Sequence, residues 1–428
     1  MHTQNTERTN TTYTRYPSIM PSHKTIHHTG LFLFLTLFCI NLLYSCSDKD
    51  IPEPHKKLSG CTVIVYMGAD NTLSEASNGD LNEMKAALPE IPENCQVVAF
   101  QDKASYGSNN NGINARIHHL TNKKSSVWKT YNGEVNSADA STVKSVLQDI
   151  VHDFPSEKYA LILWSHGSGW VDHPNRAIIQ DNGTDPKTGA RRNCWLNIGD
   201  LANILAALPH MEYIFFDACH MQSIEVAAEL YKYTSYIIAS PTEIPNEGAP
   251  YDIIMKALCD ADIRNIILGY TSGYTEDYGV LLSAICTEEF PAFCQATEKI
   301  LPQAFNKDHM PDISDVQIYA PKILASKGGL PIPYDMRSAM HHALSQESLG
   351  QWEEQWRKTV LYPAITDKWV TSYSEWGYGS RHCNMTDAEH YGGVSMNIPD
   401  VSYDIHGWNL NFQKTSWYHL GGWEQTGW

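Results

Sequence analysis

A histidine and a cysteine each follow a short apolar run in this 428-residue chain. Residues 159–165, YALILWS, precede His166, and residues 211–218, MEYIFFDA, precede Cys219. Short apolar runs bounded by turn residues predict buried strands of a parallel sheet. The carboxyl ends of such strands meet at one edge of the sheet, where ligands bind. We therefore expect the imidazole and the thiol to lie near one another, as a pair able to perform nucleophilic catalysis.

The residues that follow each side chain support this interpretation. Gly167 comes directly after the histidine, and glycine lets the backbone approach a ligand closely. The N–H groups of Gly167 and Cys219 are candidates for an oxyanion hole. Apolar residues at helical spacing predict a helix over about 220–232, whose amino end would lower the pKa of the thiol. Taken singly, a buried cysteine and a hydrogen-bonded core histidine are the simpler interpretation. Their joint placement at strand ends favours a cysteine peptidase.

The surrounding sequence alternates strands and helices, which predicts a parallel sheet covered by helices on both faces. A long polar loop is expected at 171–193, between the histidine strand and the next helix. Beyond about residue 270 the alternation stops and the end becomes rich in Trp, Tyr and Gly. The expected strands are 61–67, 95–101, 159–166, 211–219, 235–240 and 393–399, and the expected helices lie within 68–90, 141–152, 198–208, 220–232, 288–305 and 336–361.

Two motifs resemble the catalytic blocks of a known enzyme family. HGSGW at 166–170 and FDAC at 216–219 resemble those of the clostripain family of cysteine peptidases, in the caspase–gingipain–legumain clan. The segments VYMGADNTL at 65–73, YGGVSMNIP at 391–399 and WNLNFQKTSWYHL at 408–420 resemble further parts of that family. The resemblance implies an α/β fold. This fold is a caspase-like three-layer sandwich with a mostly parallel sheet flanked by helices and an appended helical, aromatic-rich C-terminal region.

Four regions follow from this organisation. Residues 1–45 are expected to be a signal peptide of the lipoprotein type, because the apolar run at 31–45 is short for a membrane span. The run ends in LLYSC, which resembles a lipobox with Cys46 as the lipidated residue. The alternative is a retained anchor helix. We expect a tether at 46–60, a caspase-like catalytic domain at 61–270, and a C-terminal region at 271–428 packed on the catalytic sheet.

The resemblance also implies roles for the site residues. Cys219 would be the nucleophile that forms an acyl-enzyme, and His166 would protonate the leaving amine and then activate water. The family places the acid at Asp217 in the pocket for the side chain before the cleaved bond. There a carboxylate selects Arg, and then Lys. The alternative is that Asp217 caps the strand end. Glu243 and Glu247 are candidates for a second acid, with Glu247 preferred because it adjoins Gly248.

The expected function is therefore an endopeptidase that cleaves peptides and proteins after Arg or Lys. Two alternatives remain, a catalytically inactive surface-binding lipoprotein of the same fold and another thiol enzyme on a similar sheet. The net charge of −17 argues against nucleic acid as a partner. No cofactor is expected to be required, and no cysteine or histidine pattern at zinc spacing occurs. The resemblance leaves calcium stimulation open without assigning residues to it.

The sequence also predicts where the protein is anchored and where it is cut. A lipid at Cys46 would anchor the protein to the bacterial cell envelope, at the outer membrane and with surface exposure. The polar loop at 183–195, GTDPKTGARRNCW, carries Lys187, Arg191 and Arg192. Exposed loops of this kind are prone to nicking, and this enzyme would prefer basic residues. The loop is thus a candidate site of self-cleavage, and the alternative is a solvated loop without a role.

Overall fold

The computed structural model describes residues 58–104, 114–171, 177–185, 187–274, 278–374 and 377–428. The expected signal peptide and Cys46 lie outside the described residues. Among the helices of the described residues, none has the length and apolar character that a membrane span requires.

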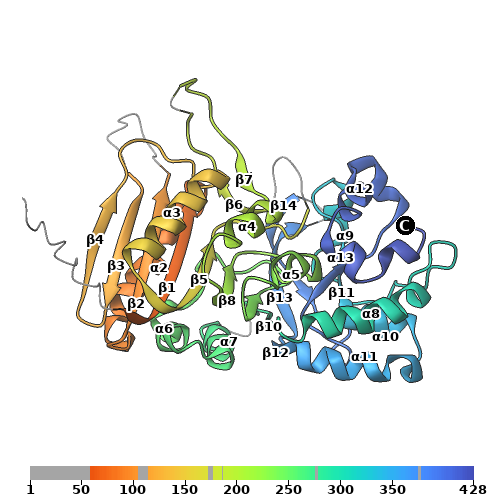
Figure 1. Ribbon diagram of the computed structural model, residues 1–428. Coiled ribbons are helices and arrows are strands. Elements are labelled where there is room, and N and C mark those ends of the chain that lie inside the picture. Colours follow the sequence, from red (N-terminus) through yellow and green to blue (C-terminus); the bar gives the residue numbers. More distant parts are fainter. Residues whose placement is uncertain (1–57, 105–113, 172–176, 186, 275–277, 375–376) are drawn as a thin grey trace, which may run out of the picture. The chain divides into compact units, whose positions relative to one another are not determined.

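A nine-stranded sheet forms the centre of the described chain (Figure 1). Its strand order is β12-β10-β9-β8-β5-β1-β2-β3-β4. The five inner strands β9, β8, β5, β1 and β2 run parallel, while the two strands at each edge pair antiparallel. The strands are β1 (Ser59–Ala69), β2 (Cys95–Lys103), β3 (Arg116–Thr121), β4 (Lys124–Thr130), β5 (Ser156–Trp164), β8 (Met211–Asp217), β9 (Tyr236–Ala239), β10 (Leu282–Cys286) and β12 (Val360–Ala364).

The register of the central strands brings their carboxyl ends to one level. Trp164, the last residue of β5, pairs with Met67 of β1 on one side and with Asp217, the last residue of β8, on the other. The residues that follow β5 and β8 therefore leave the sheet side by side. This register is what places His166 and Cys219 at a common edge.

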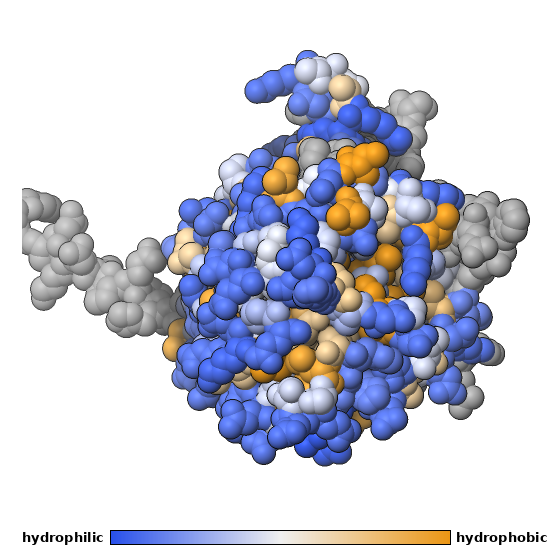
Figure 2. All heavy atoms as spheres, turned by 90° about the vertical axis from the view of Figure 1, so that its right-hand side faces the viewer, coloured by the Kyte–Doolittle hydropathy of each residue, from blue (hydrophilic) through white to orange (hydrophobic). Residues whose placement is uncertain are grey.

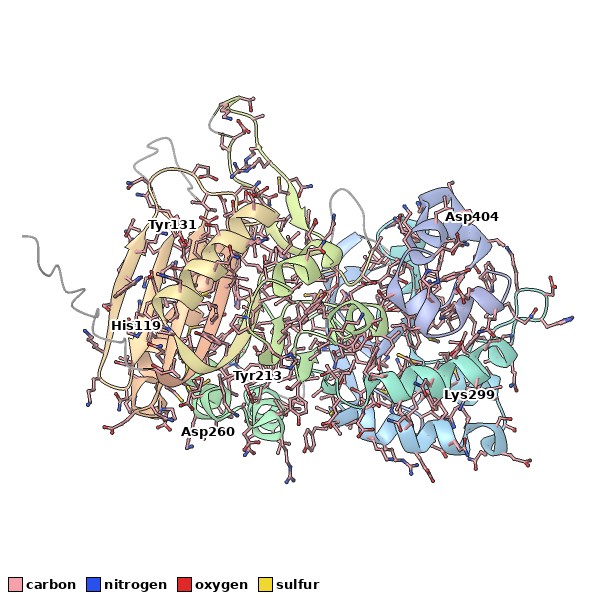
Figure 3. The ribbon with its side chains drawn as sticks, viewed as in Figure 1. His119, Tyr131, Tyr213, Asp260, Lys299 and Asp404 are labelled. Atoms are coloured by element: carbon pink, nitrogen blue, oxygen red, sulfur yellow. The ribbon has the colours of Figure 1, made fainter. Side chains whose placement is uncertain are left out.

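Alternate residues of the strands pack against helices on opposite faces, because successive side chains in a strand point to opposite sides. Ile64 and Tyr66 of β1 belong to one core and Val63 and Val65 to the other. The first core takes in α3 (Ala140–Asp153), α4 (Ile198–Leu205) and α5 (Ile224–Leu230), and the second takes in α2 (Ser74–Ala86), α6 (Tyr251–Asp260) and α7 (Ile263–Ser272). Tyr213, labelled in Figure 3, lies in the second core, where its hydroxyl donates to Leu258 O of α6 at 2.9 Å. The predicted three-layer α/β sandwich is confirmed.

The region after residue 270 packs on this sheet and also extends it with β10 and β12, which the sequence did not predict. The helix expected over 336–361 is two helices, because Ser345 caps a new one with its side chain.

The surface of the C-terminal elements is largely hydrophilic, with hydrophobic side chains showing in patches (Figure 2). The remaining elements are η1 (Leu88–Glu90), α8 (Phe290–Ala304), α9 (Lys322–Ser326), β11 (Pro333–Asp335), α10 (Met336–Ala343), α11 (Gln346–Thr359), β13 (Lys368–Ser374), β14 (Gly377–Asn384), β15 (Ser395–Asn397), η2 (Val401–His406), α12 (Trp408–Phe412), α13 (Ser416–Leu420) and η3 (Trp423–Gln425).

Two expectations near the site are corrected. The loop expected at 171–193 contains β6 (Ile178–Asp181), which pairs with β7 (Cys194–Leu196). The helix after the cysteine begins at Ile224, several residues later than expected. Its start is fixed by Ser223, whose side chain accepts a hydrogen bond from the Val226 N–H. The residues between Cys219 and this helix pair with the chain after β9. The N–H of His220 donates to Thr242 O at 2.8 Å.

Candidate active site

One pocket at the carboxyl edge of the sheet brings the predicted residues together. His166, Cys219 and Asp217 all line it, as the sequence predicted. The other lining residues come from the end of β5, from the start of α2 and from the segment after β9, and they are Leu73, Trp164, Ser165, Ile244, Pro245, Asn246 and Gly248. A thiol, an imidazole and a carboxylate thus share one small cleft.

The histidine is held by a residue that the sequence did not identify. His166 Nε2 is 2.8 Å from the hydroxyl oxygen of Thr72, which follows β1. Burial lowers the pKa of His166, so the ring is neutral at neutral pH. Asn71 stabilises the turn before Thr72 by donating from Nδ2 to Gly68 O at 2.9 Å. Thr72 is therefore a positioning residue for the imidazole.

The cysteine is a thiol in the resting site. Its Sγ accepts a hydrogen bond from the Ile244 N–H at 3.4 Å, and burial raises its pKa to about 12. The expected lowering of this pKa by a helix amino end is wrong, because the following helix begins only at Ile224. A nucleophilic role for this thiol would require loss of its proton to a neighbouring base.

Gly167 is not among the described residues that line this pocket, and its backbone pairs with residues 177–179 at the start of β6. The two hydrogen bonds around it run from the Ile179 N–H to His166 O at 3.2 Å and from the Ser168 N–H to Ala177 O at 2.9 Å. Gly167 and Ile178 face each other as an antiparallel pair that shares no hydrogen bond. The Gly167 N–H therefore points away from β6. A Cβ at Gly167 would lie 2.6 Å from Cys219 O, which shows how closely the segments after β5 and β8 approach each other.

We expect Gly167→Ala to reduce kcat by roughly 10²-fold or more, the size of effect seen when an oxyanion donor is displaced. The added methyl group must push the Cys219 carbonyl away, because a 2.6 Å contact with backbone cannot be tolerated. Steady-state kinetics on a peptide substrate, with an unfolding scan of the same sample, measures this. Gly79→Ala is the matched control, because no atom lies within 4 Å of the added carbon. Wild-type kcat in the Gly167→Ala protein would contradict this role.

Asp217 lies at the base of the pocket, nearly fully buried. Its Oδ2 accepts hydrogen bonds from the Ala249 N–H and the Tyr251 hydroxyl, both at 3.0 Å. Within the described residues its Oδ1 has no hydrogen-bond partner. Burial raises the pKa of Asp217 to about 6, so the group is charged at neutral pH. One carboxylate oxygen thus remains for a cationic side chain in the pocket.

A second carboxyl group, Asp80 of α2, lies behind Asp217. A Cβ at Gly248 would lie 2.9 Å from Asp80 Oδ2 and 3.0 Å from Asp217 Oδ2, so the two acids are close neighbours. Trp164 Nε1 donates to Asp80 Oδ2 at 2.5 Å. Burial and the charge of Asp217 raise the pKa of Asp80 to about 9, which leaves it neutral at pH 7. The pair therefore carries one negative charge, on Asp217.

The two glutamates predicted as second acids are placed differently. Glu243 accepts hydrogen bonds from the Thr371 hydroxyl at 3.2 Å and from the Ser372 N–H at 2.6 Å, which ties its segment to β13. Glu247 is exposed and adjoins Gly248. As the described residues form the pocket, neither glutamate is among its lining side chains. The acid that the sequence missed, Asp80, is a close neighbour of Asp217.

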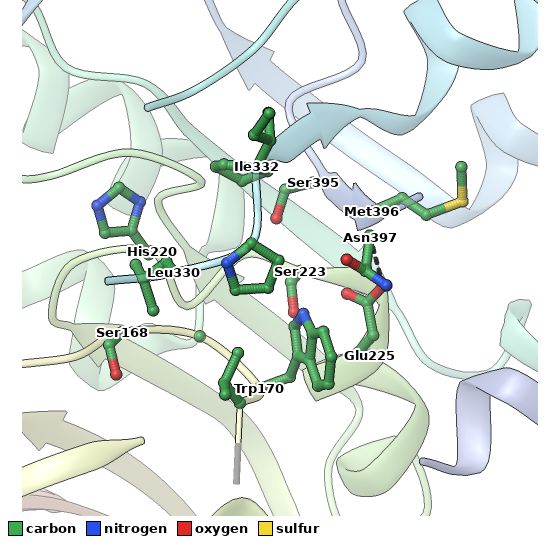
Figure 4. Close-up of a pocket in the computed structure, with 14 residues that line it drawn as sticks. Ser168, Trp170, His220, Ser223, Glu225, Leu330, Ile332, Ser395, Met396 and Asn397 are labelled. Carbon is green, nitrogen blue, oxygen red and sulfur yellow. Dashed lines mark hydrogen bonds between the residues drawn. The ribbon is translucent and has the colours of Figure 1, made fainter. Parts of the chain in front are cut away.

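Figure 4 shows a second pocket, whose lining includes residues that follow His166 and Cys219 in the sequence. It is lined by Ser168 and Trp170, which follow His166, and by His220, which follows Cys219. On its far wall the Asn397 N–H donates to Glu225 Oε1 at 2.7 Å. The C-terminal strand β15 thereby contacts α5, the helix that follows Cys219.

Two groups of side chains have a geometry that could hold a metal ion. They are His342, Asp387 and His390 in the C-terminal region, and Asp70, Glu134 and Asp181 near the catalytic edge. Neither group shares a residue with the pocket that contains Cys219.

The sequence and the fold were compared with known proteins. A model of the clostripain family matches residues 65–428, most of the chain. The chain belongs to the clostripain family. A secreted C11 cysteine protease from Bacteroides thetaiotaomicron, solved with an irreversible peptide inhibitor, is 28% identical with a TM-score of 0.71, and the match covers 86% of this chain and 99% of that one. An inactive zymogen C11 protease from Parabacteroides distasonis has a TM-score of 0.70 over 85% of this chain and 99% of its own, and at 23% identity it supports the fold alone.

One curated relative is similar in sequence. Clostripain of Hathewaya histolytica is 25% identical over an alignment of 225 residues, and the match covers 46% of this chain and 42% of that protein. The match thus spans less than half the length of this relative. The predicted family and fold class are confirmed.

Proposed function

We propose that this clostripain-family protein is a cysteine endopeptidase that cleaves after Arg and less well after Lys. The observation that carries the proposal is the placement of Asp217, a buried charged carboxylate, in the same pocket as Cys219 and His166. Burial strengthens the attraction between this carboxylate and a guanidinium, because the local dielectric is low. Arg gains two parallel hydrogen bonds where Lys gains a point charge.

In the proposed mechanism the Cys219 sulfur adds to the scissile carbonyl carbon after losing its proton to the neutral His166. The N–H groups of Gly167 and Cys219 stabilise the resulting oxyanion. The C–N bond then breaks, and protonated His166 gives its proton to the leaving amine. Water next attacks the thioester with His166 as base, which releases the acid and regenerates the thiol.

A panel of fluorogenic peptides that differ only in the residue before the cut tests this proposal. We expect hydrolysis after Arg to exceed that after Lys, with little after Leu or Asp. Equal rates for all four would contradict the pocket assignment. The alternative, a catalytically inactive binding lipoprotein, predicts no turnover of any peptide and no labelling of Cys219 by a thiol-reactive substrate analogue.

We also propose that the loop at 183–195 is a site of self-cleavage. Lys187 and Arg191 are exposed between β6 and β7, whereas Arg192 is half-buried and ion-paired. Cleavage is therefore expected after Lys187 or Arg191. A denaturing gel should show two fragments for the wild type and one intact chain for Cys219→Ala. A fully active wild type that stays intact would rule out this loop as an activation switch.

We further propose that the protein is exported and carries a lipid at Cys46, because the lipobox-like LLYSC ends an apolar run. We expect a mature protein that starts at Cys46 and fractionates with the outer membrane. Cys46→Ala should move the activity to the soluble fraction or leave a precursor. Unchanged membrane partition of this variant would favour a retained anchor helix instead. In this proposal hydrolysis needs no resident cofactor, because nucleophile, acid and pocket charge all come from the chain, and calcium stimulation is assigned to no residue.

A further inference from the structure

Two histidines and an aspartate converge in the C-terminal region, outside the pocket that contains Cys219. His342 lies in the last turn of α10, and Asp387 and His390 lie in the segment between β14 and β15. One nitrogen or oxygen from each of the three lies within 4.8 Å of the others. We call His342, Asp387 and His390 the histidine–aspartate cluster. Imidazole nitrogens and carboxylate oxygens are both ordinary ligands of zinc.

The distances within the cluster match those between ligands of one metal ion. Asp387 Oδ2 lies 3.2 Å from His390 Nδ1 and 3.4 Å from His342 Nε2. Two ligands that are each about 2.0–2.1 Å from a tetrahedral ion lie roughly 3.3–3.4 Å apart. The longer of the two distances exceeds the usual length of an N–H···O hydrogen bond, about 2.7–3.2 Å. A hydrogen bond thus accounts for His390, whose Nδ1 is 2.9 Å from Asp387 Oδ1, but not for His342.

The carboxylate is held in place by residues outside the cluster. The Ser338 hydroxyl donates to Asp387 Oδ2 at 2.7 Å. The buried Gln317 Oε1 accepts from the N–H of Thr386 at 2.7 Å and from the N–H of Asp387 at 3.2 Å. Hydrogen bonds of this kind orient a metal ligand before the ion arrives and raise the affinity for it.

The His390 ring is also fixed, by packing against α10. His341 stacks on it, with ring centroids 4.5 Å apart and an angle of 24° between the planes. His341 Nε2 lies 3.3 Å from Glu353 Oε2 of α11. Arg337 of α10 donates to the Glu389 carbonyl oxygen at 3.0 Å, which holds the backbone next to His390. The ligands therefore lose little conformational freedom when they bind an ion.

We propose that the histidine–aspartate cluster binds a zinc ion through His342 Nε2, His390 Nδ1 and Asp387 Oδ2, with water in the fourth position. Zinc takes four nitrogen, sulfur or oxygen ligands, whereas calcium and magnesium are held by oxygens. The His342 side chain is 31% exposed, so the ion reaches the cluster from solvent. The site is separate from the pocket of Cys219, and the proposal does not depend on peptidase activity.

The ion fastens α10 to the segment that precedes β15. That segment continues to Gly392, whose N–H donates to Asp335 Oδ2 at 2.8 Å. It then enters β15, where the Ser395 N–H donates to Gln222 O at 2.9 Å, three residues after Cys219. Zinc that binds only the folded chain adds its binding free energy to stability. Zinc therefore raises the unfolding temperature.

Zinc binding to the Cys219→Ala protein, made without an affinity tag, tests the proposal. This background is needed because Cys219 and His166 would themselves bind zinc. The protein is freed of metal with a chelator and titrated calorimetrically with zinc, and its unfolding temperature is measured with and without the ion. Cobalt(II) is then bound in place of zinc, because the visible spectrum of cobalt reports its coordination. We expect zinc to bind and to raise the unfolding temperature, and we expect cobalt to give the absorption of a four-coordinate ion.

Two variants locate the ion. His342→Ala and Asp387→Asn should each weaken zinc binding roughly tenfold or more and remove the cobalt absorption, because even loss of an outer-shell partner costs that much affinity. His419→Ala is the matched control and should change neither. His419 Nδ1 is 2.9 Å from Glu424 Oε2, but within the described residues this pair has no third ligand. An unfolding scan in chelator shows that each variant is folded.

The alternative is a hydrogen-bonded group of side chains that holds no metal. It predicts that zinc leaves the unfolding temperature of the parent protein unchanged. That result would overturn the proposal, and so would zinc affinity that is unchanged in both His342→Ala and Asp387→Asn. An equal loss of affinity in His419→Ala would also contradict it, because the binding would then belong to scattered surface histidines.

Discussion

Replacing Cys219 by alanine should abolish peptide hydrolysis, and replacing His166 by alanine should reduce it by roughly 10²- to 10⁴-fold. Without the sulfur no acyl-enzyme can form. Without the imidazole the thiol stays protonated, because burial raises its pKa to about 12. The measurement is kcat/KM on a fluorogenic peptide with Arg before the cut, together with an unfolding scan to show that each variant is folded.

Cys286→Ala is the matched control for this prediction. Cys286 is also a half-buried cysteine at a strand end. It pairs with Tyr236, the first residue of β9, so it lies at the opposite edge of the sheet from Cys219. Its replacement should leave kcat/KM unchanged. Turnover by the Cys219→Ala protein, or loss of turnover in Cys286→Ala, would contradict the assignment of the nucleophile.

The second large effect is expected from Asp217→Asn. Truncation of one partner of a buried charge pair costs about 2–5 kcal/mol, so kcat/KM for Arg peptides should fall by roughly 10²-fold or more. The amide oxygen of Asn can still accept from the Ala249 N–H and the Tyr251 hydroxyl, so the fold should persist. Labelling of Cys219 by a neutral thiol reagent should be unchanged, which separates loss of specificity from loss of the nucleophile.

The pH profile gives an independent check on the same carboxylate. Asp217 has a pKa of about 6, so below that pH it is protonated and loses its attraction for Arg. In wild type, the ratio of kcat/KM for Arg peptides to that for Leu peptides should therefore fall as the pH drops through about 6, and in Asp217→Asn this dependence should vanish. Asp80→Asn is the control, since Asp80 is already neutral at pH 7. Equal loss of Arg preference in Asp80→Asn and Asp217→Asn would contradict the assignment of the charge to Asp217.

The sequence predicted the parts of this site that depend on strand ends. Once β5 and β8 are recognised as neighbouring parallel strands, His166, Asp217 and Cys219 must meet at one edge. Their register, with Trp164 opposite Asp217, is the physical basis of that success. The outer antiparallel strands at both edges were not predicted, since the expected strands did not include them.

Residues that reach the site from distant elements could not be predicted in this way. Thr72 contacts His166 only because β1 lies beside β5, and Asp80 contacts the Asp217 region from a helix on one face. The thiol pKa was predicted in the wrong direction, because the start of α5 depends on the Ser223 cap and on backbone pairing after β9.

The central claim is that Cys219 attacks peptides whose Arg side chain is bound by Asp217. Intact-mass spectrometry after exposure to a peptidyl chloromethyl ketone with Arg at the reactive end tests this most directly, with peptide mapping to locate the adduct. Our account predicts one adduct, on Cys219, formed much faster than with the matched Leu or Asp reagent, and it predicts that Asp217→Asn loses this preference. An adduct on another cysteine, or equal rates with all three reagents, would contradict the account.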